Sequence, residues 1–245
     1  MSPVQRPLAL AVLPLGVACT TVDAPLAQDL PAARLQLVVI DVDQGDISYD
    51  AAPTDTLQIR GHAWGRAADA EEAESRLGMT GFEARREGSV AYAAGTAVGW
   101  GSGTDIEVTG PGRVDVTLET RAGAAYLSGV TGRHAVRADR IEAWDVAGSV
   151  DLHSTGPVEA SLLPAPGDTI RIAAEGDVVL SLPPGLDYDL QIWGDPAHDL
   201  RVEDLGFGPV FSDAGYFAAV SGPGTTRVDV VVTNGSVEVQ RAWTW

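Results

Sequence analysis

The sequence predicts an all-β protein, a right-handed β-helix (β-solenoid) of short coils with glycine turns and one short helix. From Leu35 onward, apolar and polar residues alternate over short segments, which is the pattern of strands with one buried face. Glycine turns separate these segments, and between Gly123 and Gly194 they recur every 16 to 20 residues, which indicates stacked repeats. Gly, Ala and Val are abundant while aromatic residues make up 6% of the chain. Small residues suit a narrow interior in which stacked units share one apolar column.

We expect one domain over residues 35–243, with an irregular first part over 35–109 and regular coils over 110–243. In the first part, Ala70, Ala73 and Leu77 have helical spacing, acids fill the first turns, and Gly78 follows as a stop signal, so the pattern predicts a helix over 68–77. This helix would cap the stack or lie along one of its faces. A β-sandwich of hairpins also has short, closely spaced strands, but the near-constant spacing of the turns favours the solenoid.

The amino-terminal segment has the three parts of an export signal. Arg6 precedes an apolar run over 7–17, and small residues lead to the only cysteine, Cys19. The run is too short to span a bilayer, which takes about 20 apolar residues. We therefore expect a signal peptide over residues 1–18.

The residues before Cys19 resemble a bacterial lipobox, which is cut before a cysteine that then receives lipid. Gly16 holds the place where that pattern has leucine, and Leu15 lies one position earlier. The same residues also fit an ordinary signal-peptidase site, and both interpretations cut after Ala18. We expect lipidation of Cys19 and a lipid-anchored tether over 19–34, which contains two prolines.

The charge balance excludes several classes of function. There are 34 acidic and 16 basic residues, which gives a net charge of −18, and no basic residue is lysine. An acidic surface repels phosphate backbones, so we expect no nucleic-acid partner. Schiff-base catalysis by lysine is excluded, and one cysteine allows no internal disulfide.

Three short motifs occur in an order that resembles the bacterial "putative adhesin" β-solenoid family, a group of envelope and extracytoplasmic proteins. They are the turn over 43–46, the Glu-Glu-Ala helix over 71–73 followed by the 87–89 turn, and the 105–111 phrase with later glycine-turn coils ending at 233–239. The resemblance covers about residues 35–240. It implies a right-handed β-helix and no known catalytic residues. Two departures are Asp139-Arg140, where a glycine turn is usual, and the long segment over 203–224.

No metal or cofactor site is expected. Asp41, Asp43 and Asp46 suggest calcium ligation, but position twelve of an EF-hand loop starting at Asp41 falls on Ala52, so solvated strand and turn acids fit better. None of the four histidines (His62, His134, His153 and His198) has a second His or a Cys at ligand spacing. A calcium-stabilised solenoid stays open as a minor alternative.

Aromatic side chains gather in the interruption of the coil rhythm over 203–224, among glycines. With the preceding tryptophan they form the candidate partner-binding residues: Trp193, Phe207, Phe211, Tyr216 and Phe217. Exposed aromatic residues mark interfaces, but the same residues also fit a loop that folds back and covers the carboxy-terminal coils. Trp243 and Trp245 would plug the last coil or fray.

These observations predict a non-catalytic lipoprotein of the bacterial cell envelope, held to the membrane at Cys19, with a role in adhesion, binding or envelope maintenance. Its partner would be an unidentified envelope or extracellular molecule. The alternative is an extracellular polysaccharide-acting β-helix enzyme. That enzyme would need a groove with clustered carboxylates or arginines on neighbouring coils, whereas most of the turns here are tight.

Overall fold

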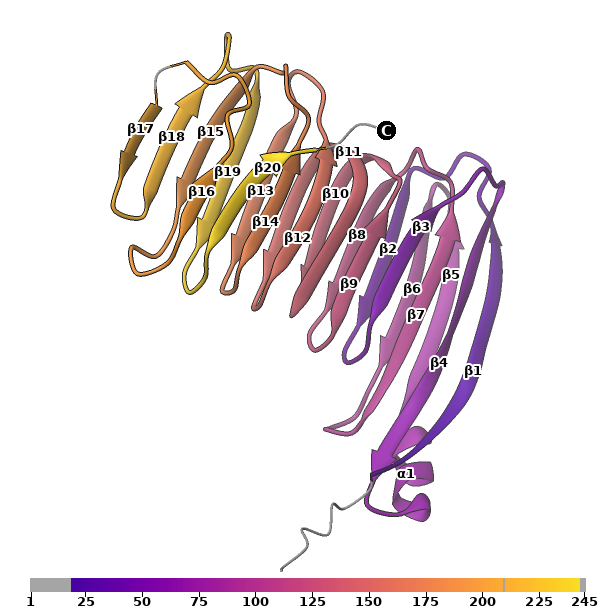
Figure 1. The fold of residues 1–245 in the computed structure, drawn as a ribbon. Coiled ribbons are helices and arrows are strands. Elements are labelled where there is room, and N and C mark those ends of the chain that lie inside the picture. The colour runs from indigo at the N-terminus through magenta and orange to yellow at the C-terminus, as the bar shows by residue number, and fades with distance from the viewer. Residues whose placement is uncertain (1–18, 209, 243–245) are drawn as a thin grey trace, which may run out of the picture.

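The computed structural model describes residues 19–208 and 210–242. The fold is all-β, and a short helix lies at one end (Figure 1). The strands form two facing walls, and each wall is a ladder of neighbouring strands. The predicted all-β class is therefore confirmed.

The first wall is parallel in its centre and antiparallel at both ends. In spatial order its strands are β5 (Gly81–Glu87), β6 (Val90–Thr96), β2 (Leu37–Val42), β8 (Asp115–Thr120), β10 (Thr131–Ala138), the second half of β11 (Arg140–Ser154), β13 (Thr169–Ala174), β19 (Thr226–Val232), β15 (Tyr188–Trp193), β18 (Tyr216–Val220) and β17 (Val210–Asp213).

The second wall faces the first. Its strands, in spatial order, are β1 (Thr20–Pro31), β4 (Thr56–Ala67), β7 (Ser102–Gly110), β3 (Ile47–Ala51), β9 (Ala124–Ser128), the first half of β11, β12 (Val158–Leu163), β14 (Val178–Leu182), β20 (Val237–Arg241) and β16 (Leu200–Val202).

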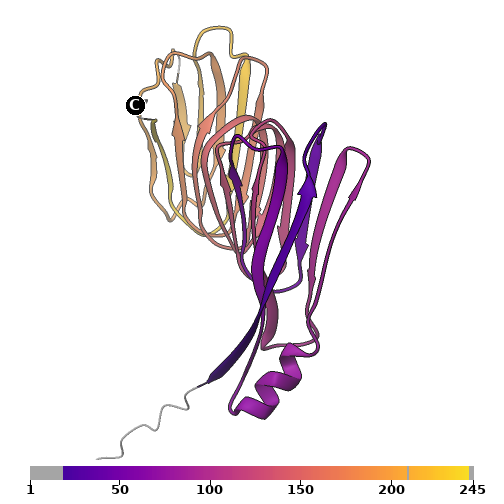
Figure 2. The ribbon, with the colours of Figure 1, turned by 90° about the vertical axis from the view of Figure 1, so that its right-hand side faces the viewer.

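Strand β11 joins the two walls. Its first half pairs with β9 and β12, its second half pairs with β10 and β13, and the register shifts between Ala143 and Val146. Asp145, at this bend, has a φ of 54°, a left-handed conformation that non-glycine residues rarely adopt. All twenty strands therefore belong to one sheet, which closes almost completely into a flattened barrel (Figure 2).

The prediction of a right-handed β-solenoid of repeated coils is wrong. The structure has a single barrel-shaped sheet of mixed strands. We call two consecutive strands that lie on opposite walls a layer, and the spatial order of these layers differs from their order in the chain. The β2–β3 layer lies between β6–β7 and β8–β9, and the β19–β20 layer lies between β13–β14 and β15–β16. The spacing of the turns correctly indicates local strand–turn–strand units. It does not indicate which of these units lie next to one another in the sheet.

The core is a set of columns in which equivalent inward residues of neighbouring strands stack. One column of the first wall contains Leu118, Val136, Leu152, Ile172 and Val230, all at most 1% exposed. The second wall supplies Ala125, Ile141, Val158, Val178 and Val237. Burial of these side chains contributes about 25 cal/mol for each Å² of apolar surface removed from water.

Residues 20–31, expected to lie in a tether, form strand β1, which pairs antiparallel with β4 over its whole length. The segment has a period of two, with alternate side chains partly buried from Thr20 to Leu30. Two prolines, Pro25 and Pro31, are tolerated because β1 is an edge strand and needs hydrogen bonds on one side only. The two prolines led to the prediction of a tether, although the alternation that indicates a strand is present in the same segment.

The predicted helix is confirmed as α1 (Ala70–Leu77), and Asp69 caps its first turn by accepting the N–H of Glu72 at 2.8 Å. Its buried residue, Ala73, packs over Gly65 of β4, where a Cβ atom would lie 2.2 Å from the Ala73 carbonyl oxygen. The helix therefore lies on the lower part of β4 and β1 (Figures 1 and 2). In the part of the chain that the structure covers, no helix is long and apolar enough to cross a membrane.

The predicted signal peptide over 1–18 and the residues Trp243 and Trp245 lie outside the described residues. Cys19 is the first described residue and is exposed.

Candidate binding surface

Three aromatic side chains lie next to one another on the outer surface at the far end of the first wall. Trp193 of β15, Tyr216 of β18 and Phe211 of β17 form this group, which we call the aromatic strip. The ring centroids of Trp193 and Tyr216 are 5.4 Å apart, and those of Tyr216 and Phe211 are 5.8 Å apart. Trp193 is 40% exposed and Phe211 59% exposed, so the strip presents continuous aromatic surface to solvent.

The register of three antiparallel strands places these side chains together. Trp193 pairs directly with Tyr216, and β17 pairs with β18 so that Phe211 lies opposite Ala218, two residues along from Tyr216. Side chains that are opposite or diagonal across an antiparallel pair lie within reach of each other. Since residues alternate between the two faces of a strand, Phe217 between these positions points inward.

The five aromatic residues predicted as a partner site fall into two groups. Phe217 is 9% exposed, and Phe207 packs against the core beside it, with ring centroids 6.3 Å apart. These two follow the alternative prediction that the segment folds back over the barrel. Trp193, Phe211 and Tyr216 point outward instead.

Apolar side chains of neighbouring strands extend the strip. Val231 of β19 lies opposite Trp193 in the parallel register and is 43% exposed, and Val220 of β18 is 42% exposed. Sequence reasoning missed Val231 because β19 is far from β15 along the chain, and only the strand order brings the two together. A contiguous exposed apolar surface of this kind is characteristic of an interaction site.

Strand β17 is the edge of this wall. All four of its residues are exposed, and within the described chain it pairs only with β18. An uncovered edge strand presents backbone donors and acceptors to which a further strand can be added. The turn after it is held by the Gly194 N–H, which donates to the Gly215 carbonyl at 2.6 Å, so the strip rests on a braced end of the barrel.

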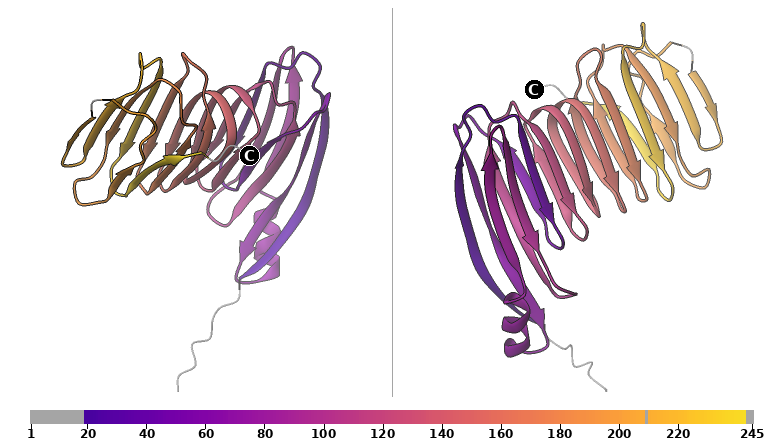
Figure 3. Two further views of the ribbon diagram at one scale, coloured as in Figure 1. Left: turned by 45° about the horizontal axis from the view of Figure 1, so that its top comes forward. Right: turned by 180° about the vertical axis from the view of Figure 1, so that it is seen from behind.

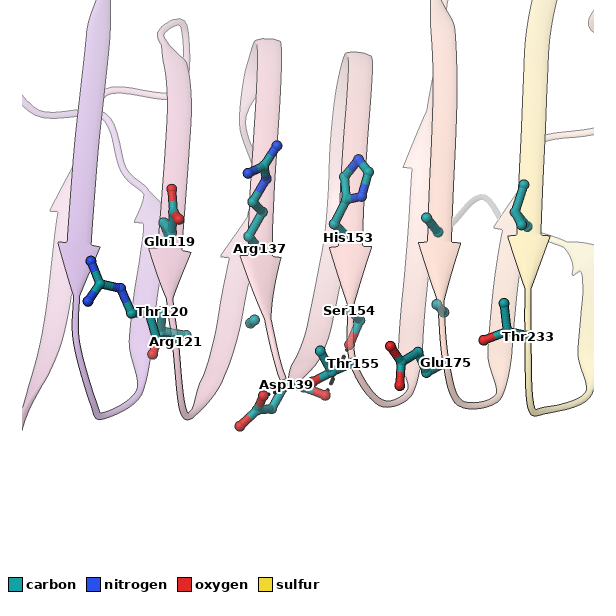
Figure 4. A pocket seen from close by; sticks show the side chains of 14 residues that line it. Glu119, Thr120, Arg121, Arg137, Asp139, His153, Ser154, Thr155, Glu175 and Thr233 are labelled. Carbon is teal, nitrogen blue, oxygen red and sulfur yellow. Dashed lines mark hydrogen bonds between the residues drawn. The ribbon is translucent and has the colours of Figure 1, made fainter. Parts of the chain in front are cut away.

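A shallow groove of about 560 Å³ lies on the first wall where its strands enter the turns (Figure 4). Glu119 of β8, Arg137 of β10 and His153 of β11 occupy one row of cross-strand neighbours along it. Ala173 and Val231 continue the row toward Trp193. The groove therefore changes from charged to apolar as it approaches the strip. Sequence reasoning could not find it because its residues lie on five separate strands and in the turns that follow them.

The aspartates considered for calcium have other partners. Asp43 forms an ion pair with Arg121 at 3.0 Å, and Asp46 accepts the N–H of Ala124 at 2.8 Å. Partial desolvation and the nearby Glu119 carboxylate raise the pKa of Asp41 above its ordinary value. The described residues contain no group of three or more His, Cys, Asp or Glu side chains arranged to hold a metal ion.

Three of the histidines lie at the surface beside a carboxylate. His62 is 3.1 Å from Asp105, His153 is 3.1 Å from Asp151, and His198 is 3.5 Å from Asp195. The fourth, His134, is buried. Each His–carboxylate pair is isolated from the others, which fits separate surface contacts and not a shared site.

The fold and this surface define an all-β barrel-like protein with an exposed aromatic strip at one end. No protein-family model matches the chain, and no curated protein matches it significantly. Among solved structures, the chain is similar to a "putative cell adhesion protein" from Clostridium sporogenes, with 8% identity, a TM-score of 0.47, and coverage of 90% of this chain and 100% of that one.

Two further solved structures are similar at comparable coverage. A "putative adhesin" from Bacteroides fragilis is 11% identical with a TM-score of 0.28, covering 88% of this chain and 97% of that one. A "putative lipid binding protein" from Parabacteroides distasonis is 9% identical with a TM-score of 0.27, covering 88% and 96%. At these identities and TM-scores, the similarity assigns no function to this chain.

Proposed function

We propose that this chain is a non-catalytic binding protein, exported and anchored to the cell envelope through lipid on Cys19, that holds a protein partner on the aromatic strip. The observation that carries this proposal is the exposure of Trp193, Tyr216 and Phe211 as one contiguous surface. The few residues that carry most of the binding energy at protein interfaces are enriched in Trp and Tyr. An adhesion role and membership of the adhesin-like family suggested by the sequence motifs remain predictions.

The position of the strip supports a display function. Cys19 leads into β1 at one end of the barrel, and the aromatic strip lies at the other end (Figures 1 and 3). From β5 to β17 the first wall spans ten strand spacings of about 4.8 Å, or about 48 Å. A rigid β body of this length holds a binding surface well away from its anchor.

The partner we infer is a protein that adds an extended segment along β17 and packs apolar side chains on the strip. Backbone hydrogen bonds to an open edge supply affinity in this mode, and pockets or rings beside the edge supply specificity. Two copies of this chain, each with a net charge of −18, repel each other. A different protein with basic residues around an apolar contact is therefore the better fit.

Cleavage of polysaccharide would have to use the groove, and its carboxylates are poorly placed for that chemistry. Three carboxylates line the groove, those of Glu119, Asp139 and Glu175. Asp139 accepts the Gly123 N–H and the Thr155 hydroxyl, so its carboxylate is occupied in holding a turn. Glu119 and Glu175 form no ion pair among the described residues. Their strands are separated by three spacings, about 14 Å, whereas glycosidases hold their two carboxyl groups about 5 to 9.5 Å apart.

Site-specific photo-crosslinking in cells tests the proposal. A benzophenone side chain at Phe211 is expected to give a discrete adduct, and the same probe at Leu163, which is 38% exposed on the other wall, is the control position. Trp193→Ser should abolish the adduct. Trp144→Ser, at a tryptophan of matched exposure (39%), should preserve it.

The proposal fails if the probe at Leu163 gives the same adduct, or if the adduct from Phe211 survives Trp193→Ser. Mass spectrometry of the protein from envelopes tests the anchor separately: it should show a diacylglyceryl group on Cys19. A plain amino terminus at Cys19 would contradict the anchored form.

A further inference from the structure

The end of the molecule that carries Cys19 also carries the most exposed aromatic side chain among the described residues. Cys19 precedes β1, in which Thr21 pairs with Arg66 of β4. On the other side of β4 the Arg66 N–H donates to the Gly101 carbonyl at 2.7 Å. Trp100, the residue before Gly101, therefore lies about two strand spacings, or about 10 Å, from the start of β1.

The β6–β7 turn at this end is apolar where turns are usually polar. Val98 is 63% exposed and Trp100 is 87% exposed. Met79, which follows α1 and is 43% exposed, leads into β5, whose first residue, Gly81, pairs with Thr96 just before the turn. These side chains stabilise no core, so their exposure calls for a partner outside the barrel.

The turn is held in place. The Ala97 N–H donates to the Asp43 carboxylate at 3.2 Å, and the Gln44 side chain donates to the Gly99 carbonyl at 2.8 Å. Gly99 adopts a φ of 78°, a left-handed conformation that glycine accepts without strain. An ordered backbone that exposes apolar side chains is a surface prepared for contact, since a turn that is already ordered loses less entropy on binding.

We infer that this end of the molecule is a membrane-contacting surface, with Val98 and Trp100 inserted among the lipid headgroups of the bilayer that holds acylated Cys19. The inference rests on the proposed anchoring at Cys19. Tryptophan is the residue that concentrates at membrane interfaces, and a lipid chain is commonly reinforced by a second membrane-binding element. Figures 1 and 2 show α1 and the start of β1 together at this end.

The charges at this end favour zwitterionic lipid. Arg66 and Arg76 lie beside the turn, and the Arg76 guanidinium donates to the Arg66 carbonyl at 2.6 Å. The exposed face of α1 carries Glu71, Glu72 and Glu74, which would be repelled by an anionic surface. The bilayer therefore fixes the orientation of the barrel through apolar contact at the turn.

Depth-dependent fluorescence quenching tests this inference. The full chain, lipidated in a bacterial host, is labelled with an environment-sensitive fluorophore at Val98→Cys and reconstituted into phosphatidylcholine vesicles that contain doxyl-labelled lipid. The matched control is Ser89→Cys, in the turn at the other end of β6, about 23 Å away along that seven-residue strand. Mass spectrometry of the same preparation determines whether Cys19 is acylated.

The expected result is acylated Cys19 with quenching several-fold stronger at residue 98 than at residue 89, and most effective for doxyl groups near the headgroups. Acylated Cys19 with equal, weak quenching at both positions would overturn the inference and leave the anchoring intact. A turn covered by a second copy of the chain would give that same outcome. Unmodified Cys19 would overturn both the inference and the proposed anchoring.

Discussion

Replacement of His134 by leucine is expected to stabilise the protein, and to do so more at acidic pH. His134 points into the barrel from β10, between Val116 and Val150 of the neighbouring strands. It is 3% exposed, and neither ring nitrogen has a hydrogen-bond partner among the described residues. Leu190 of β15 occupies the equivalent inward position, so the column already accommodates leucine.

The magnitude follows from burial and from the titration of the ring. Removing an unsatisfied buried polar group is worth about 1 to 3 kcal/mol. Burial lowers the pKa of His134 below its ordinary 6.5, and the nearby Asp115 carboxylate opposes this shift only in part. Below about pH 6.5 the unfolded chain takes up a proton that the folded chain resists. The free energy of unfolding therefore decreases as the pH is lowered, by up to about 1.4 kcal/mol per pH unit.

Urea unfolding of the wild type and His134→Leu at pH 7.5 and pH 5.5 measures both effects. The variant should be more stable at pH 7.5, and the difference should widen at pH 5.5. The control is His153→Leu, because His153 lies at the surface 3.1 Å from Asp151; its stability should change by less than about 1 kcal/mol. A less stable His134→Leu variant, or a difference that is the same at both pH values, would refute the reasoning.

Three further predictions concern the barrel. Leu152→Ala, in the core of β11, should lower the free energy of unfolding by about 2 to 5 kcal/mol. Leu163 of β12 is 38% exposed, so Leu163→Ala should lower it by less than about 1 kcal/mol. Equal losses in denaturant titrations would contradict the assignment of inward and outward side chains on the two walls. Gly123→Ala should prevent folding or lower the free energy of unfolding by more than about 3 kcal/mol, because the φ of Gly123 is 152° and a Cβ would lie 2.0 Å from the Gly45 carbonyl oxygen. Gly88 has open space around it, so Gly88→Ala should lower the free energy of unfolding by about 1 kcal/mol. Circular dichroism on heating distinguishes the two variants. Burial raises the pKa of Tyr49 and Tyr188, so stability should fall above about pH 10 as these phenols ionise in the unfolded chain; two of the five tyrosines should stay un-ionised in absorbance titrations until the protein unfolds.

Local structure could be predicted from the sequence because its causes are local. The Asp69 cap, the acidic first turn and Gly78 define α1, and period-two alternation defines strands such as β8 and β13. The departure at Asp139 is different, because its explanation lies in residues that are 16 positions away in the chain. Its carboxylate accepts the Gly123 N–H at 3.2 Å and the Thr155 hydroxyl at 2.7 Å, so it stabilises a turn that lacks glycine.

The order of the layers could not be predicted, because each strand–turn–strand unit offers the same apolar face to any neighbour. Val39 pairs with both Tyr92 and Thr117, which places β2 between two segments that follow it in the chain. At the other end, the excursion over 203–224 allows β19 to return between β13 and β15. Such choices depend on which faces and edges remain uncovered, which is a property of the assembled barrel.

The binding surface was predicted in part. Aromatic clustering around 203–224 indicated the region, but exposure depends on strand register, which directs Tyr216 outward and Phe217 inward. Trp100 carried no signal in the sequence. Its significance depends on its position close to Cys19, because β4 pairs with β1 on one side and contacts the turn that carries Trp100 on the other. Along the chain, Trp100 and Cys19 are far apart.

Hydroxyl-radical footprinting of the protein in native envelopes, compared with the purified protein, tests the central claim most directly. The account predicts that oxidation of Trp193 at the strip and of Trp100 at the membrane end falls several-fold in envelopes, while oxidation of Trp144, with 39% exposure against 40% for Trp193, stays unchanged. Equal oxidation of Trp193 in both preparations would contradict the claim that the aromatic strip is where this protein holds its partner.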